Sequence, residues 1–301
     1  MARSISDRLG QTERRIELND DSVFLTSDND AVDLLSAAKG GWFSQVSSLE
    51  AFRPRLIAFV VASILLIAGA IRYGLPVAAK VAVWATPDAA VTLIDSSTLS
   101  TFDRIVLGES GLAEDRQKVL LSAFDELAIA AETKESTRLL FRDGGRIGPN
   151  AFALPGGTVV LTDQLAEILT DDEVIAVFAH ELAHVKHNHG LQQMYRAFGF
   201  AAIVTVIAGD MSLVLEEILG GGGLLVAMAA SREMEFEADS EGVDLLRKVG
   251  RDPANLKTAL DTLMEKTCPK NLAELCEETG WFSSHPGSIE RTQALEEAIA
   301  Q

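Results

Sequence analysis

Residues 178–190 read FAHELAHVKHNHG and hold four of the five histidines in this 301-residue chain. The stretch contains an H-E-x-x-H sequence. On a helix, His180 and His184 differ by about 40° in direction and about 6 Å in height, so both imidazoles can face one metal ion. Glu181 lies roughly a quarter turn away and can reach a water molecule on that ion. The sequence therefore predicts a metal site with an adjacent general base.

A helix is expected to carry these residues. Thr170 followed by Glu173 forms a capping box, and the two aspartates between them place negative charge at the positive end of the helix dipole. We expect the helix to continue past Met194, because only Gly190 interrupts it and one glycine is tolerable there.

The remaining histidines of the stretch are expected to stay off the ion. His187 lies about 10 Å beyond His180 along the helix axis, too far for bonds of about 2 Å to an ion that His180 and His184 share. His189 is expected on the opposite face. We expect both to be solvent-facing or to support the site without binding the ion.

A catalytic zinc ion needs a third protein ligand and an open fourth position for water. His285 is a candidate, and so is a carboxylate on the helix expected over residues 231–249. There Glu235 and Asp239 share one face and Glu237 points away. One of the pair can bind the ion while the other accepts a hydrogen bond from a ligating imidazole. The residues alone leave this choice open, and a solvated acidic face has the same pattern.

The charge and cysteine content limit the partners and the compartment. A net charge of −18 repels phosphate backbones, so we expect no nucleic-acid partner. The two cysteines, Cys268 and Cys276, are compatible with a disulfide and equally with two thiols. Neither forms a zinc-finger pattern.

The run at 56–71, LIAFVVASILLIAGAI, contains no charged residue. As a helix it is about 24 Å long, and flanking arginines can extend it across a hydrocarbon core of about 30 Å. A buried core helix would show a polar stripe, which this run lacks. We expect an uncleaved membrane anchor over 53–75 that contacts the lipid bilayer through 56–71. A small excess of basic residues on the N-terminal side favours a cytoplasmic N-terminus.

The rest of the chain predicts an α+β fold, mainly helical with a small β-sheet, preceded by one transmembrane helix. Strand character is expected in RRIEL, SVFLT, VTLID and RIVLG, in a hairpin RLLFRDGGRIG, and on both sides of the turn in NAFALPGGTVVLT. Helices are expected over 114–131, over 231–249 and after Asp252–Pro253. The apolar run at 197–209 is expected as a buried helix and Gly220–Gly223 as a link or hinge. The expected divisions are 1–52, an acidic segment or small module; 53–75, the anchor; 76–104, a linker; and 105–301, the catalytic domain.

Three separated segments also match one known family. They are HELAHV with the following His189 and Gly190, residues 231–239 (SREMEFEAD), and Ser284-His285-Pro286 with Arg291. In the second segment the matching residues are Ser231, Arg232 and the run from Glu235 to Asp239. The sequence resembles the gluzincin metallopeptidases that include HtpX, the CAAX prenyl proteases, and related mitochondrial inner-membrane and bacterial periplasmic proteases. The single anchor is more similar to the single-span periplasmic or intermembrane-space members.

This resemblance implies roles for the residues. One Zn²⁺ per chain would be bound by His180, His184 and Glu235, with Asp239 supporting the ligands. Glu181 would take a proton from the zinc-activated water and pass it to the leaving amine.

The resemblance further implies that His285 donates to the oxyanion and that Arg291 supports it. The substrate is expected to pair with an exposed strand edge. The expected contacts on that strand are Asn150, Ala151, Phe152 and Ala153.

The implied function is a membrane-anchored zinc endopeptidase that hydrolyses misfolded or unassembled envelope proteins. It would lie in a bacterial inner membrane with its N-terminus cytoplasmic and its catalytic domain periplasmic. The alternative is a membrane-anchored chaperone or assembly factor with a structural or latent zinc site. Glu181 favours the enzyme, because a structural site has no use for that carboxylate. A prenyl-protein protease would need several membrane helices.

Overall fold

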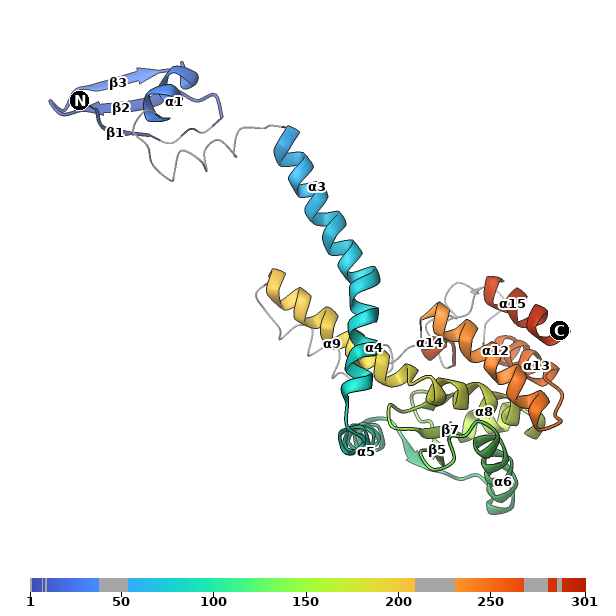
Figure 1. Cartoon of the computed structure of the whole chain (residues 1–301). Coiled ribbons are helices and arrows are strands. Elements are labelled where there is room, and N and C mark those ends of the chain that lie inside the picture. The colour runs from blue at the N-terminus through green and yellow to red at the C-terminus, as the bar shows by residue number, and fades with distance from the viewer. Residues whose placement is uncertain are drawn as a thin grey trace. The chain divides into compact units, whose positions relative to one another are not determined.

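The computed structural model of the chain divides into two compact units, Met1–Ala70 and Ile71–Gln301 (Figure 1). The residues that the structure describes are 2–6, 8, 10–37, 54–208, 231–267, 281–285 and 289–301. Cys268, Cys276 and Gly220–Gly223 lie outside them, so the predictions for these residues stay predictions.

The first unit begins with an antiparallel three-stranded sheet and a helix. Its elements are β1 (Ala2–Ile5), β2 (Arg14–Leu18), β3 (Val23–Thr26) and α1 (Asn29–Ala37). β2 and β3 form the strand pair predicted from RRIEL and SVFLT. Val32 of α1 is buried, and Asp33 on the same helix accepts a hydrogen bond from the buried Arg14 guanidinium.

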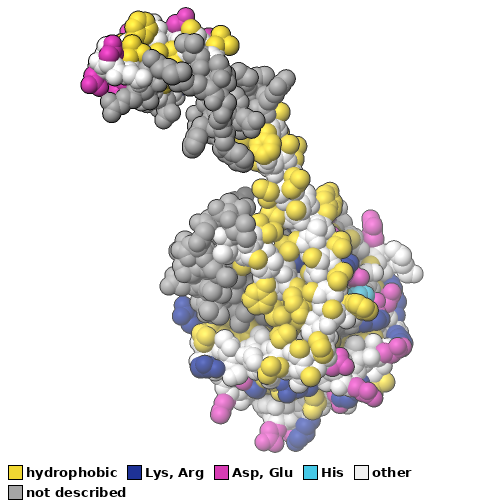
Figure 2. Space-filling view, turned by 60° about the vertical axis from the view of Figure 1, so that its left-hand side comes forward, with side chains coloured by type: hydrophobic (Ala, Val, Ile, Leu, Met, Phe, Trp, Pro, Cys, Tyr) yellow, Lys and Arg dark blue, Asp and Glu magenta, His cyan; other side chains and the backbone are white. Residues whose placement is uncertain are grey.

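A long apolar helix follows. It consists of α3 (Pro54–Gly69), a π-helical turn η1 (Ala70–Gly74) and α4 (Leu75–Ala85). Within it, Ile57–Ala85 is 29 residues long and is the one helix among the described residues with the length and composition of a membrane span. Many of its hydrophobic side chains are exposed, and they gather along the face of the helix that Figure 2 shows. The helix therefore extends well beyond the predicted end of the anchor at residue 75, and at 1.5 Å per residue it is about 43 Å long.

The second unit combines a four-stranded sheet with helices, as the predicted α+β class requires. The strands are β4 (Gly108–Glu109), β5 (Arg138–Asp143), β6 (Ala151–Ala153) and β7 (Thr158–Thr162). Besides α4, the described helices are α5 (Asp88–Ile105), α6 (Glu114–Ala130), α7 (Asp163–Ile168), α8 (Asp171–Lys186), α9 (His189–Ala208), α12 (Arg232–Lys248), α13 (Ala254–Thr267), α14 (Trp281–Ser284) and α15 (Ile289–Ala300).

The sheet has the strand order β4-β5-β7-β6, in which β5 and β7 are parallel and the other pairs antiparallel. The predicted hairpin between β6 and β7 is confirmed. The predicted hairpin in RLLFRDGGRIG is wrong, because β5 pairs with β4 and β7 instead of with the residues that follow its turn. Gly145 makes that turn at φ 50°, where an added Cβ would meet the Val106 carbonyl oxygen at 2.5 Å. The chain then crosses the sheet, and Ile147 is buried in a small apolar cluster.

The strand expected in VTLID is wrong, because α5 covers all of it. The strand expected in RIVLG is present only at its last residue, because Arg104 and Ile105 end α5 and Gly108 begins β4. Pro87 precedes the helix in an extended conformation, and the Thr92 hydroxyl donates to the Asp88 carbonyl one turn back. Asp95 of α5 is buried and accepts hydrogen bonds from the Gly156 amide (2.9 Å) and the Thr158 hydroxyl (2.5 Å). These bonds fix α5 to the turn between β6 and β7.

Helix α8 lies at the centre of the core. Its capping box is present as predicted, with Thr170 and Glu173 each accepting from the other's backbone amide. It contacts α6, α12, α13 and β6 (Figure 1). Phe178 is fully buried, and its ring meets that of Phe124 edge-on at 5.4 Å. Burying such a side chain contributes about 1.5–3 kcal/mol, so α8 is held firmly before any site chemistry is considered.

The predicted continuation of this helix past Met194 is wrong. α8 ends at Lys186, Asn188 adopts the left-handed conformation at φ 54°, and α9 starts at His189. Asparagine tolerates that conformation better than most residues, so neither proline nor glycine is needed to break the helix. The break turns His189 back toward α8.

Residues 197–208 of the predicted apolar run lie in α9, and this part of the helix is only partly buried. Ala201 is buried, whereas Phe198 and Phe200 are about half exposed. α9 packs on α4, where the Tyr195 and Thr86 hydroxyls lie 2.6 Å apart.

Candidate metal centre

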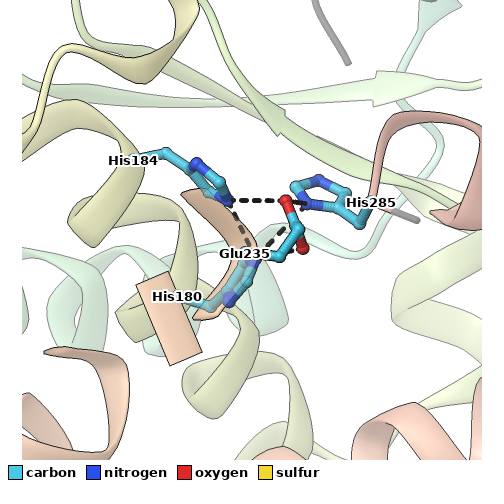
Figure 3. Close-up of side chains that lie close together, drawn as sticks. All are labelled: His180, His184, Glu235 and His285. Carbon is cyan, nitrogen blue, oxygen red and sulfur yellow. Dashed lines mark hydrogen bonds and ion pairs between the residues drawn. The ribbon is translucent and has the colours of Figure 1, made fainter. Parts of the chain in front are cut away.

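Four buried side chains converge between α8, α12 and the end of α14 (Figure 3). His180 and His184 come from α8, Glu235 from α12, and His285 directly follows α14. One donor atom from each lies within 4.8 Å of the other three. In the part of the chain that the structure describes, this is the one group of three or more such side chains with that spacing.

The donor separations fit one tetrahedral ion. Donors bound about 2.0–2.1 Å from a tetrahedral zinc ion lie about 3.3 Å from one another. The two imidazole Nε2 atoms of His180 and His184 are 3.0 Å apart, and Glu235 oxygens lie 3.3 Å from His184 Nε2 and 3.5 Å from His180 Nε2. His285 Nδ1 lies 3.3 Å from His180 Nε2 and 3.2 Å from Glu235 Oε1. The residues present therefore fit a zinc ion.

A carboxylate and an arginine hold this group from behind. Asp239 Oδ1 lies 2.9 Å from His180 Nδ1, the ring nitrogen that faces away from the other donors. Arg291 makes a bidentate contact with Asp239 at 2.7 and 2.9 Å and reaches Glu235 Oε2 at 2.6 Å. Glu235 and Asp239 lie on one face of α12, as their spacing predicts.

The electrostatics of the group favour a cation. Burial opposes charge on His180, but Asp239 and Glu235 outweigh it and raise the pKa of His180 to about 9. Burial lowers the pKa of His184 to about 4. Burial also opposes charge on Glu235, yet His285 and Arg291 hold the pKa of its carboxyl well below the usual range. The centre thus draws a positive charge, which a divalent ion can supply by displacing the protons.

Glu181 lies beside the group without being part of it. Its side chain is fully buried, and burial raises the pKa of its carboxyl. His285 Nε2 lies 3.3 Å from Glu181 Oε1. A buried carboxylate adjacent to a metal position can accept a proton from a water molecule there.

His285, one of the candidates for a third donor in the sequence, lies in the donor group together with Glu235. Its Nδ1 belongs to the donor group, while its Nε2 lies 3.3 Å from the Ala151 carbonyl oxygen of β6. The ring stacks on Trp281, with centroids 4.0 Å apart and planes 16° from parallel. No signal in the sequence pointed to Trp281, because its contact depends on how α14 packs.

The predicted substrate strand lies at the end of the described sheet. β6 pairs with β7 on one side only. Asn150 is buried, and its side-chain amide donates to the Ser284 hydroxyl at 3.2 Å. Ala151 and Phe152 are buried as well, whereas Ala153 is half-buried. Contact between this strand and a peptide would therefore involve backbone groups more than side chains.

His187 and His189 lie outside the donor group. His187 is partly exposed, with Nδ1 3.3 Å from Glu237 Oε1. His189 is only 2% exposed, and its Nδ1 lies 2.9 Å from His184 Nδ1. The expectation that His189 points to the opposite face is wrong, because that expectation assumed a helix without the break at Asn188.

Comparison with known proteins identifies relatives of this part of the chain. The family model described as peptidase family M48 matches residues 114–299. Metalloprotease LoiP of Escherichia coli (strain K12) is 33% identical over 155 residues, which are 50% of this chain and 59% of that protein. Mitochondrial metalloendopeptidase OMA1 of Schizosaccharomyces pombe is 33% identical over 158 residues, 51% of this chain and 44% of that protein.

A protease HtpX homolog of Methylibium petroleiphilum is 29% identical over 216 residues, 58% of this chain and 73% of that protein. The chain thus spans less than two thirds of the length of LoiP and OMA1. All of these matches are partial.

Proposed function

The chain belongs to peptidase family M48, and from this premise we propose that it is a membrane-anchored zinc-dependent endopeptidase. The observation that carries the proposal is the buried donor group. His180, His184 and Glu235 would hold one Zn²⁺, and Glu181 stands next to them without joining them. A purely structural site gives no reason for burying that additional carboxylate.

The residues of the site suggest how a peptide bond is cleaved. When bound, zinc would supply Lewis acidity toward the scissile carbonyl and lower the pKa of a water molecule. Glu181 accepts the proton of the attacking water and delivers it to the leaving amine nitrogen. Asp239 holds the His180 ring in place, and Arg291 neutralises the carboxylates behind it. The backbone edge of β6 aligns the substrate by strand pairing.

The proposed substrates are misfolded or unassembled envelope proteins, which the resemblance to this family implies. The helix Ile57–Ala85 would anchor the protein in a bacterial inner membrane, with the N-terminus cytoplasmic and the catalytic domain periplasmic. A reporter fused to the C-terminus tests this orientation. A reporter active only in the cytoplasm would contradict it.

Metal analysis combined with a cleavage assay tests the activity. Purified full-length protein in detergent should contain one zinc per chain and cleave casein. Glu181→Gln should keep the zinc, and its cleavage rate should be about 10²–10⁴-fold lower, which is the contribution typical of a general base. Glu233→Gln is the matched control, because this glutamate lies on α12 with its side chain 68% exposed. Cleavage by Glu181→Gln at the wild-type rate would end the proposal.

The second candidate is a chaperone or assembly factor with a structural or latent zinc site. His285 favours it, because its Nδ1 supplies a fourth protein donor, and four protein ligands are typical of structural zinc. The same preparation separates the two functions. Wild-type protein that holds zinc tightly, prevents aggregation of an unfolded protein and cleaves nothing would support the second candidate.

A further inference from the structure

We propose that His189 and Glu237 form a hydrogen-bonded relay that orients His184 for metal binding. The inference rests on the proposed metal site and adds two positioning residues to it. Neither residue belongs to the donor group, and neither is assigned a role in the chemistry above.

The relay is a continuous series of polar contacts behind His184. The Nδ1 atoms of His184 and His189 lie 2.9 Å apart, both in buried rings. On the other side of its ring, His189 Nε2 lies 3.2 Å from Glu237 Oε2. Glu237 is half exposed, so the series runs from the buried donor group to the protein surface.

Metal binding fixes the position of each proton in this series. His184 faces the donor group with Nε2, which must offer a lone pair to a metal ion. Its proton is therefore on Nδ1 and is donated to His189 Nδ1. That leaves the proton of a neutral His189 on Nε2, from which it is donated to Glu237. Each of the two rings then has one allowed tautomer.

The two metal-facing histidines are thereby supported in different ways. A carboxylate lies directly beside His180, with Asp239 Oδ1 2.9 Å from His180 Nδ1. No carboxylate lies against His184 Nδ1 among the described contacts, and His189 fills that position. Ligating histidines generally require such a partner to fix the ring and the tautomer. Glu237 thus serves His184 through one intervening imidazole.

The fold makes the relay possible at the corner between α8 and α9. On an unbroken helix, residues five apart point about 140° away from each other. The left-handed Asn188 ends α8 and places His189 at the start of α9, against His184. α12 brings Glu237 to the same corner, two residues after the donor Glu235.

Zinc affinity of the metal-free full chain tests the relay, measured by competition with a chromophoric chelator. His189→Leu should raise the zinc Kd about 10–100-fold, the range typical of such supporting partners. Glu237→Leu should raise it by about tenfold, at the lower end of that range, because solvent can partly replace a half-exposed acceptor. Glu237→Gln keeps an acceptor oxygen and should stay close to wild type. Glu233→Leu, exposed on the same helix, is the matched control.

A second readout separates positioning from a merely structural role. In zinc-loaded protein with ¹⁵N-labelled histidine, His184 should carry its proton on Nδ1 and His189 on Nε2. A His189 proton on Nδ1 would overturn the relay, as would unchanged zinc affinity in a folded His189→Leu variant. If His189→Leu does not fold, the difference between Glu237→Leu and Glu237→Gln decides the question, and equal affinities reject the relay. Wild-type protein without zinc affinity would instead reject the metal site and the relay together.

Discussion

Each unit of the molecule contains a buried arginine paired with an aspartate, but the two pairs lie in different surroundings. In the first unit Arg14 is 7% exposed and its partner Asp33 is 39% exposed. In the second unit Arg291 is 5% exposed and Asp239 is 3% exposed. Solvent screens the first pair, which joins α1 to β2. The second pair is sealed, and its aspartate also holds His180. The same kind of ion pair therefore supports the fold in the first unit and the candidate metal centre in the second.

The largest expected effect comes from breaking the sealed pair. Asp239→Ala removes the bidentate partner of Arg291, which keeps its contact with Glu235, and the carboxylate beside His180 Nδ1. Removing one member of a buried pair typically costs about 3–5 kcal/mol. We expect the free energy of unfolding of the second unit to fall by this amount, measured by guanidinium denaturation followed by circular dichroism. Asp239→Asn retains an acceptor and should lose less. If Asp239→Ala lowers the free energy of unfolding by less than the substitution of an exposed residue does, the pair is not shielded from solvent.

The next effect concerns the close contact between α12 and α8 at the centre. A Cβ added at Gly242 would lie 3.2 Å from the His180 amide nitrogen. Gly242→Ala should therefore push α12 away from α8 and cost about 1–3 kcal/mol, as overpacking does. The shift should also weaken zinc binding, because Glu235 moves with α12. Ser240→Ala, exposed on the same helix, is the control, and equal behaviour of the two variants would contradict the prediction.

A smaller effect is expected for the exposed pair. Asp33→Asn should destabilise the first unit by at most about 1 kcal/mol, because a partly exposed ion pair is screened by solvent. Faster hydrogen exchange in β2 of the full chain, measured by mass spectrometry, would report this loss. Asp30→Asn removes a charge that is 88% exposed and should leave exchange unchanged. Exchange in the second unit should not respond to either change.

The smallest effect is a pH dependence of the same pair. Burial tends to raise the pKa of Asp33, but hydrogen bonds from Arg8 and Arg14 outweigh it and lower the pKa below its usual value. The unfolded chain therefore takes up the proton first as pH falls, so the contribution of Asp33 is complete above about pH 4 and is lost below it. The difference in β2 exchange between wild type and Asp33→Asn should shrink as pH falls through this range. If this difference in exchange grows as pH falls, the prediction that the pKa of Asp33 is lowered by folding is wrong.

Local signals in the sequence predicted local structure well. The capping box at Thr170 depends on residues within one turn, and the turn between β6 and β7 is marked by Pro155-Gly156-Gly157. Both were predicted because nearby residues fix them. The VTLID strand failed for the opposite reason. Its β-branched residues favour a strand, but Pro87 sets the start of a helix and the hydrogen bonds of Asp95 fix that helix to the turn at Gly156.

The candidate site was predictable as a set of residue types but not as an arrangement. Glu235 and Glu233 are both acidic residues of α12, and only packing makes one fully buried and the other 68% exposed. The contact of His189 with His184 was not predicted, because Asn188 gives a weak signal for a helix break. Glu237 was correctly expected to point away from Glu235. Its contact with His189 depends on the same break.

The hydrogen bonds by which Asp95 attaches α5 to the sheet have a mechanical consequence. Asp95 holds the turn at Gly156 and Thr158, and α5 follows the apolar helix with only two residues between them. Tension along the apolar helix would pass through α5 into this turn, and from there into β6. If the helix spans a bilayer as proposed, thickening or stretching of that bilayer would pull on the strand beside the donor group, and this turn is the point at which the load would reach the candidate metal centre.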